Sequence, residues 1–310
     1  MWQTAATTTT SPEQGCLALA SPRYELIPVG DVLERAQRLP ANATVTVTCS
    51  PKHGIETSLD LAEKLSARGY TAVPHIAARL VRSRAELRDI LHRVADSGLQ
   101  DVFIVGGDSP SVAGPYPGGR ELLEAVAEAG PRPRRVGVPA YPEPHASIPV
   151  AHMDSAMETK NTLADYAVTQ ICFDPEVILA WLAEQHRGGM HLPVHVGLPG
   201  VIDRARLMGL AMRIGLGAST RVLRRQSGLA SRLLGSSSYQ PDHLVQALVP
   251  AFGAPATPNL AGFHINTFNQ VDETVAWVER TALELRRYHA AQAPAMAPPS
   301  PQSHVFAKDY

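Results

Sequence analysis

Hydrophobic residues along the chain follow two alternating patterns. Short runs rich in β-branched and aromatic residues, typical of buried strands, occupy residues 24–29, 44–49, 71–77, 101–105, 135–141, 166–173, 193–198 and 262–268. Between most of these runs, apolar residues repeat with the period of a helix, at 57–68, 83–97, 119–129, 175–187, 203–214 and 241–252. The pattern therefore predicts eight strands that alternate with helices.

Local signals mark the ends of several predicted helices. Gly69 and Gly98 each follow a helical stretch at the position where glycine often ends a helix. Ser83, with Glu86 three residues later, predicts a capping box. Alternating strands and helices favour a parallel sheet, and no G-x-G-x-x-G motif follows the first strand to indicate an open dinucleotide-binding sheet. We expect one (β/α)8 TIM-type barrel over residues 22–290.

The segments at either end of the predicted barrel differ from it in composition. Residues 1–21 are rich in threonine and alanine, and residues 291–310 are rich in proline, so both are expected to be disordered tails. Residues 215–239 are irregular and predict an elaborated loop or an extra helix before the eighth strand. Neither a signal peptide nor an apolar run long enough to span a bilayer is evident, so we expect a cytoplasmic protein without membrane association.

Composition narrows the classes of partner. The 310 residues carry a net charge of −1, whereas nucleic-acid and membrane-surface partners usually require a clear basic excess. Cys16, Cys49 and Cys172 lie far apart without metal-ligand spacing, which predicts neither a disulfide framework nor a metal site. A homo-oligomer is compatible with the sequence, which contains no stripe that would identify an interface.

Polar residues gather where the predicted strands end. Because active sites of parallel barrels lie at the carboxyl ends of the strands, these residues are candidates for chemistry. Each also has a structural interpretation: Glu25 as half of an ion pair, Asp108 as a turn residue and His75 as a core histidine. The candidates are Glu25, Thr48, His75, Gly107, Asp108, Tyr141, His145, Gln170, His264, Asn266, Thr267 and Asn269.

Strings of residues at seven of these strands resemble those of the methylenetetrahydrofolate reductase family, in the same order. They are Y-E-L-I-P at 24–28, V-T-V-T at 45–48, P-H at 74–75, V-G-G-D-S-P at 105–110, V-P-A-Y-P-E-P-H at 138–145, T-Q-I-C-F-D at 169–174 and G-F-H-I-N-T-F-N at 262–269. The resemblance covers about residues 22–285. The fifth and sixth strings are fairly specific in combination.

The resemblance implies a folate substrate and a reductase reaction. Hydride from NADH or NADPH would pass through FAD to 5,10-methylenetetrahydrofolate and give 5-methyltetrahydrofolate, in the one-carbon metabolism that serves methionine synthesis. Glu25 would be the general acid at N10 of the folate, since opening the imidazolidine ring requires a proton there. Asp108 would lie beside both flavin and folate, and Gln170 would bind the pterin.

The resemblance also implies a set of cofactor contacts. The flavin would be held by Thr48, His75, Gly107, Asp108, Tyr141, His145 and Lys160, with Lys160 facing the phosphates. A basic run at 217–226 has two interpretations. It is either a solvated helix face or an anion site in which Arg221 binds the glutamate tail of folate or a nucleotide phosphate.

Two departures from the family pattern keep other functions open. Gly106 stands where the family has an arginine, and the stretch 152–160 lacks an asparagine and an arginine of the family's dinucleotide-binding string. One alternative is a flavin-poor or flavin-free folate enzyme of one-carbon metabolism, either a direct NADH reductase or a methyltransferase-type protein. Another is a non-catalytic barrel subunit, against which the retained Glu25 argues.

Overall fold

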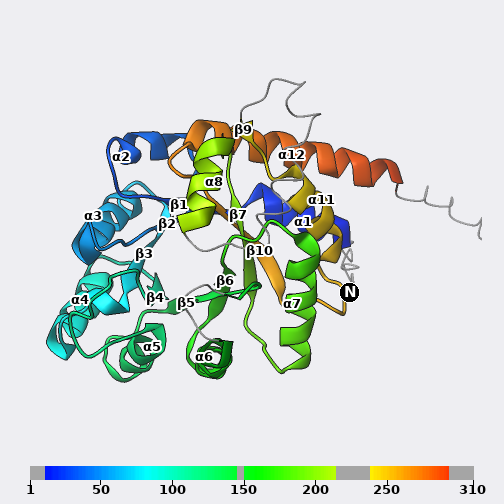
Figure 1. The fold of residues 1–310 in the computed structure, drawn as a ribbon. Coiled ribbons are helices and arrows are strands. Elements are labelled where there is room, and N and C mark those ends of the chain that lie inside the picture. Colours follow the sequence, from blue (N-terminus) through cyan, green and yellow to red (C-terminus); the bar gives the residue numbers. More distant parts are fainter. Residues whose placement is uncertain (1–10, 145–149, 214–237, 293–310) are drawn as a thin grey trace, which may run out of the picture.

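Eight parallel strands form a closed barrel that is surrounded by helices (Figure 1). The computed structural model describes residues 11–144, 150–213 and 238–292. Each strand pairs in parallel with its neighbours in the order β1-β10-β7-β6-β5-β4-β3-β2, and β2 pairs with β1 to close the ring. The predicted (β/α)8 TIM-type barrel is therefore confirmed. The strands are β1 (Arg23–Leu26), β2 (Thr44–Val47), β3 (Thr71–Ala77), β4 (Asp101–Val105), β5 (Arg135–Ala140), β6 (Tyr166–Thr169), β7 (Val194–Pro199) and β10 (Leu260–Asn266).

Helices connect the strands on the outside of the barrel (Figure 1). The described helices are α1 (Ser11–Ala20), α2 (Val32–Arg35), α3 (Gly54–Ser66), α4 (Arg84–Asp96), α5 (Gly119–Glu128), α6 (Val150–Leu163), α7 (Pro175–Arg187), α8 (Arg204–Arg213), α11 (Asp242–Leu248) and α12 (Val271–Gln292). Short 3-10 turns η1 (Ala36–Arg38), η2 (Ala78–Leu80) and η3 (Val249–Ala251) supplement them. A two-stranded antiparallel sheet, β8 (Ile202–Asp203) with β9 (Ser238–Tyr239), lies outside the barrel. No helix among the described ranges is long and apolar enough to cross a membrane.

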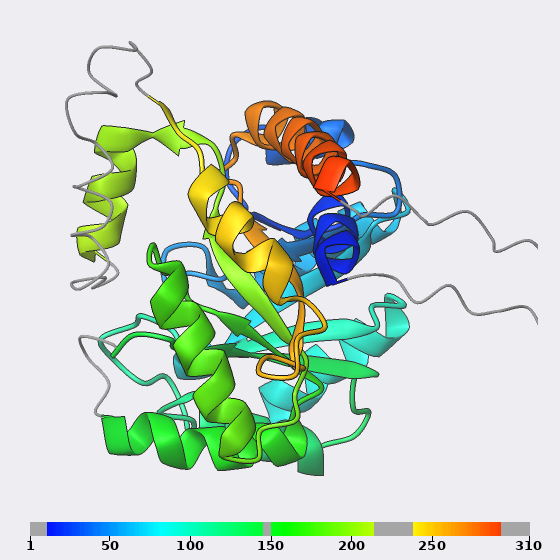
Figure 2. The same ribbon diagram turned by 90° about the vertical axis from the view of Figure 1, so that its right-hand side faces the viewer.

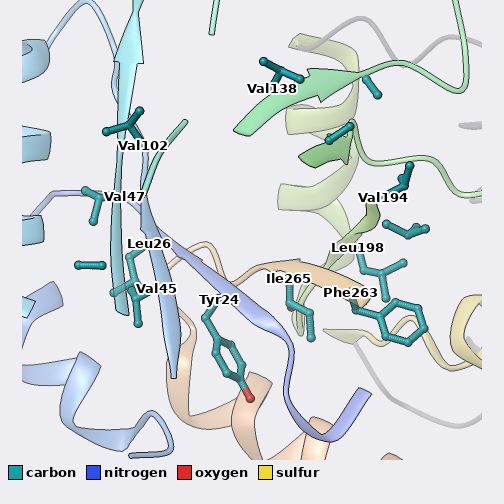
Figure 3. Close-up of a cluster of buried hydrophobic side chains, with 14 of the residues drawn as sticks. Tyr24, Leu26, Val45, Val47, Val102, Val138, Val194, Leu198, Phe263 and Ile265 are labelled. Atoms are coloured by element: carbon teal, nitrogen blue, oxygen red, sulfur yellow. The ribbon is translucent and has the colours of Figure 1, made fainter. Parts of the chain in front are cut away.

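Alternation along each strand divides the interior into two cores. In β1, Tyr24 and Leu26 join the large cluster of buried residues that packs strands against helices (Figure 3). Their neighbours Arg23 and Glu25 point to the opposite face, into the barrel, because successive side chains of a strand alternate. Apolar residues inside the barrel, among them Phe103, form a smaller separate cluster. The polar side chains of β1 therefore lie inside the barrel.

The sequence signals at helix ends have the expected geometry. Ser83 Oγ accepts a hydrogen bond from the Glu86 backbone N–H at 3.1 Å, as the predicted capping box requires. The Glu86 carboxylate bonds back to the N–H of Arg82, one residue before the cap. Gly69 and Gly98 have φ values of +88° and +72°, the left-handed conformation that ends a helix at low steric cost.

Helix α1 corrects part of the predicted N-terminal tail. We expected residues 1–21 to be disordered, but Ser11–Ala20 is helical and buries Cys16 and Leu19 completely. Figure 2 shows α1 beside α12, so the two ends of the described chain are neighbours. Burial against a helix more than 250 residues away stabilises a segment whose own sequence pattern is weak. The remaining tail residues, 1–10 and 293–310, lie outside the described residues.

The sixth strand is shorter than its hydrophobic run predicts. The run spans residues 166–173, but β6 ends at Thr169. Gln170 Oε1 accepts a hydrogen bond from the Ile171 backbone N–H at 3.0 Å, which replaces a ladder partner. Ile171 and Phe173 then pack with Ile202, Leu207 and Tyr239 in a cluster separate from the main core.

A buried ion pair joins three strands at the amino-terminal end of the barrel. Arg23 Nη2 lies 3.1 Å from Asp101 Oδ2 and donates to Tyr166 Oη at 2.6 Å, and Tyr166 Oη donates to Asp101 Oδ1 at 2.9 Å. Gly137 leaves room for the Tyr166 ring, since a Cβ at this position would overlap it. The triangle links β1, β4 and β6 across the interior of the barrel, where nearly all of its surface is removed from water.

Candidate active site

The Glu25 carboxyl group lies between two imidazole rings near the carboxyl ends of the strands. His264, from the neighbouring strand β10, places Nε2 at 3.0 Å from Glu25 Oε2. His75, from β3, places Nε2 at 3.9 Å from the same oxygen. The Glu25 side chain retains 17% of its accessible surface, whereas both histidines are buried. Glu25 is therefore a carboxyl group that is paired on one side and reachable from the other.

Electrostatics favour the carboxylate form of Glu25. Burial raises its pKa, but the hydrogen bond from His264 and the positive charge that His264 and His75 carry when protonated together outweigh burial, so the pKa lies below its ordinary value. Burial also lowers the pKa of His75, to about 4, despite the opposing charge of Glu25. At neutral pH His75 is thus neutral beside an ionised Glu25.

The loop after β4 places Asp108 at the mouth of the barrel. Gly107 has φ +88°, and a Cβ added to it would lie only 3.0 Å from the Cβ of Ala77. The Arg79 backbone N–H donates to Gly106 O at 3.1 Å and ties this loop to the end of β3. Asp108 is exposed. The pKa of Tyr141 is raised, mainly by burial and to a smaller extent by the negative charge of Asp108. Asp108 and Tyr141 therefore lie on the same side of the mouth.

Lys160 lies over the ring of Tyr141. Its amine is buried, donates to Pro139 O at 2.7 Å and lies 5.5 Å from the centroid of the Tyr141 ring. Burial lowers the pKa of Lys160 to about 8. A larger fraction of Lys160 is therefore neutral than of a fully solvated lysine. Because its amine donates to Pro139 O, the phosphate contact expected for Lys160 requires this amine to change partners.

The remaining candidates lie at neighbouring strand ends. Gln170 follows β6 and is half-buried, and its backbone N–H donates to Ala140 O at 2.8 Å. Thr48 follows β2, and its N–H donates to Leu26 O at 3.0 Å. Cys172 is buried, and burial, followed by the negative charge of Glu143, raises the pKa of its thiol to about 12. Cys172 is therefore an inert thiol rather than a nucleophile.

The structure places most, but not all, of the predicted site residues at the carboxyl end of the barrel. Glu25 and His75 are in direct proximity, and Asp108, Tyr141 and Lys160 form a second group. His145 and Arg221 lie outside the described residues. The described part of the chain contains no group of three or more metal-ligating side chains with the geometry of a metal site.

His264 is one of the polar candidates of the last strand, but the sequence assigns it no role in the chemistry. In the structure its imidazole makes the closest contact to Glu25. The signal was present, since the first and last strands of a closed barrel are neighbours and their inward-facing residues meet. The contact between His264 and Glu25 is therefore predictable from the sequence only if the barrel is assumed to be closed.

The fold and the site together define a class of protein: a (β/α)8-barrel enzyme scaffold with a carboxylate–imidazole centre at the carboxyl ends of its strands. The model of the family described as methylenetetrahydrofolate reductase matches residues 19–208, which is more than half of the chain. The chain therefore belongs to the methylenetetrahydrofolate reductase family.

Two solved structures have a similar arrangement of elements, and their titles name other enzymes. One, titled "Crystal Structure of Phosphonopyruvate Hydrolase", has a TM-score of 0.45 and 11% identity, with 93% of this chain and 92% of that chain covered. Another, orotidine 5'-monophosphate decarboxylase from Sulfolobus solfataricus, has a TM-score of 0.41 and 10% identity, with 86% and 98% covered.

Proposed function

We propose that the protein reduces 5,10-methylenetetrahydrofolate to 5-methyltetrahydrofolate with hydride from NADH or NADPH. Membership of the family supports a reductase that acts on folate. The observation that carries the finer proposal is the position of Glu25, a reachable carboxyl group held by two histidines at the carboxyl ends of the strands. The reaction needs an acid at this place, because N10 of the folate must take up a proton.

Proton delivery by Glu25 accounts for the first step of the proposed reaction. Protonation of N10 by Glu25 lets the bond between N10 and the methylene carbon break, which leaves that carbon on N5 as an iminium. NADH or NADPH, when bound, supplies the hydride that reduces this carbon to a methyl group. The barrel interior below Glu25 is filled with side chains, which keeps bulk water away from the inner face of the carboxyl group.

Asp108 and Gln170 are the residues that we propose to bind the pterin. The pterin edge presents N–H donors next to an acceptor, which a carboxylate and an amide can match. The Asp108 carboxylate is exposed and can accept two such hydrogen bonds. The amide oxygen of Gln170 is already bonded to the Ile171 N–H, so Gln170 offers its amino group in this conformation. Arg221 remains a proposed contact for the glutamate tail of the folate.

The described residues fit the flavin ring better than they fit the phosphates of FAD. Thr48, Asp108 and Tyr141 lie at strand ends where a ring can contact them. On the flavin side, position 106 is glycine, and on the phosphate side Lys160 is buried and bonded to a backbone oxygen. The lysine that the family resemblance assigns to the phosphates of FAD is thus already bonded, and we derive no step through flavin.

A flavin-free enzyme is the second candidate, and the buried amine of Lys160 favours it. In that form hydride passes directly from the nicotinamide to the folate. The visible absorption spectrum of the purified protein, before and after FAD is added, separates the two candidates. Flavin bands that bleach with NAD(P)H and recover with methylenetetrahydrofolate support the FAD relay. A colourless protein that oxidises NADH only when the folate is present supports direct transfer. Absence of turnover with either donor would exclude both reductase forms and leave the methyltransferase-type or non-catalytic alternatives.

Replacing Gly106 with the family's arginine tests whether the protein is an FAD-dependent or a flavin-free enzyme. At position 106 an added Cβ would meet only the Gly119 backbone nitrogen, at the ordinary distance of 3.7 Å. We expect Gly106→Arg to fold and to bind FAD more tightly than the natural chain, by about five- to tenfold, because a cation near the bound flavin is worth about 1 kcal/mol. Flavin fluorescence quenching measures the affinity.

Gly106→Met is the control for size without charge. It should leave the FAD affinity near that of the natural chain. If both variants bind FAD equally, charge at position 106 is not what limits flavin binding.

A further inference from the structure

We propose that His264 is a positioning residue for Glu25: its Nε2–H holds the carboxyl group in place and stabilises the carboxylate that remains after the proton is transferred. The inference rests on the proposed function, since the proton acceptor is N10 of the folate. It assigns a role to a side chain that is not in contact with the reacting atoms. The contact between Nε2 and Oε2, at 3.0 Å, carries it.

The sheet fixes the geometry of this pair. β1 and β10 are paired in parallel with Arg23 opposite His264 and Glu25 opposite Asn266. The His264 side chain is 2% exposed, so its ring is held by packing as well as by the hydrogen bond. The imidazole therefore approaches Glu25 from the interior of the barrel, and the reachable side of the carboxyl group faces the mouth.

Buried polar atoms identify which nitrogen of His264 carries the proton. Nδ1 of His264 is buried and has no hydrogen-bond partner in the part of the chain that the structure describes. A proton on Nδ1 would be a buried donor without an acceptor, which is costly. A proton on Nε2, in contrast, points to Glu25 Oε2. Nε2 is thus the favoured position for the ring proton, and its N–H donates to the carboxylate.

The other charged groups around Glu25 do not replace this donor. His75 approaches the same oxygen from β3 at 3.9 Å, too far for a hydrogen bond, and burial lowers its pKa to about 4. Arg23, two residues earlier on β1, is engaged with Asp101 and Tyr166. The hydrogen bond from His264 is the first of the effects that lower the pKa of Glu25 against the opposing effect of burial.

Proton transfer uses the oxygen that the histidines leave free. Both imidazoles approach Oε2, so Oε1 is the atom that can carry the exchangeable proton. The Oε1–H bond breaks as the N10–H bond forms, and its electron pair stays on the carboxylate, which His264 stabilises. The next proton comes from solvent. His264 thereby makes Glu25 a stronger acid and at the same time reduces the fraction of Glu25 that is protonated at neutral pH.

The pH profile of kcat/KM distinguishes this role from a purely structural one. In the natural protein the profile falls as pH rises through the pKa of Glu25, because only protonated Glu25 donates. His264→Leu removes the donor but leaves the burial of Glu25, so its pKa rises and the alkaline limb moves to higher pH. At low pH, where Glu25 is protonated in both proteins, we expect His264→Leu to be about tenfold slower or more, since its acid is weaker.

Two further variants make the test specific. His264→Gln retains an N–H close to the position of Nε2 and should keep its alkaline limb nearer to that of the natural protein. His195→Gln replaces another histidine of the barrel, one that stands edge-on to Tyr166 at 5.7 Å, and should not move the limb. An unchanged limb in His264→Leu, with activity reduced equally at every pH, would overturn the proposal.

The tautomer of His264 can be read without any activity. In ¹⁵N-histidine NMR spectra of the free protein, we expect the His264 signals of a ring protonated at Nε2, which shift in a Glu25→Gln variant. A ring protonated at Nδ1 would overturn the proposal even in an active reductase. A correct tautomer in a protein that reduces no folate would instead count against the proposed function alone.

Discussion

Glu25→Gln should reduce the turnover number by about 10²–10⁴-fold, because glutamine has nearly the same shape but no acid proton to deliver. The substitution retains an acceptor for the His264 N–H through the amide oxygen, so the fold should persist. Initial rates of NAD(P)H oxidation with 5,10-methylenetetrahydrofolate measure the loss. Titration with the folate should show that binding changes far less than turnover, because the lost proton matters mainly at the transition state.

A glutamate elsewhere in the chain provides the matched control. Glu63 on α3 also has a lowered pKa, caused mainly by its hydrogen bond from Arg93. Its pair lies outside the barrel, so Glu63→Gln should leave turnover within about twofold. If Glu25→Gln retains full activity, the proton at N10 comes from elsewhere and the assignment of Glu25 is wrong.

Arg23→Met should lower the free energy of unfolding by about 3–5 kcal/mol, because it leaves the Asp101 carboxyl group buried without its cation. Tyr166 still donates to Asp101 and limits the loss. Urea unfolding followed by circular dichroism measures the difference. Few other single changes outside the apolar core should have so large an effect on this chain.

The double variant Arg23→Met/Asp101→Leu is the control for the same pair. Replacing both charges with apolar groups removes the unpaired charge, so the double variant should recover most of the loss. Arg93→Met breaks a solvated network with Glu56, Asp60 and Glu63 and should cost about 1 kcal/mol or less. Equal losses from Arg23→Met and Arg93→Met would show that burial does not determine the strength of these pairs.

Strands were the most predictable part of the fold. Runs such as residues 44–49 and 101–105 are apolar because both faces of a barrel strand are covered, and short apolar runs between turns are visible in the sequence alone. Helix α1 was not predictable in this way. Its two fully buried residues, Cys16 and Leu19, pack on elements near the other end of the chain, and a window of ten residues contains no trace of that contact.

The sequence predicts where the candidate site lies, but not which of its side chains contact one another. Topology places the ends of the strands together, which brings Glu25, His75 and Asp108 to one end of the barrel. The sequence predicts Glu25 as the acid but not the two imidazoles beside it, whose combined effect, led by the hydrogen bond from His264, outweighs burial and lowers the pKa of Glu25. The role of Lys160 at the phosphates stays a prediction, and the hydrogen bond from its amine to Pro139 O is a contact that no local sequence pattern encodes.

Closure of the barrel between β1 and β10 has a consequence for synthesis of the chain. Glu25 and His264 are separated by 239 positions, and the β1–β10 register that aligns them forms only after the last strand is available. A ribosome-bound chain that ends before Leu260 exposes two open sheet edges and carries an acid without its histidine. Loop closure over such a separation is slow. Assembly of the proton donor is therefore one of the final events of folding, and incomplete chains should be inactive and prone to edge-to-edge association.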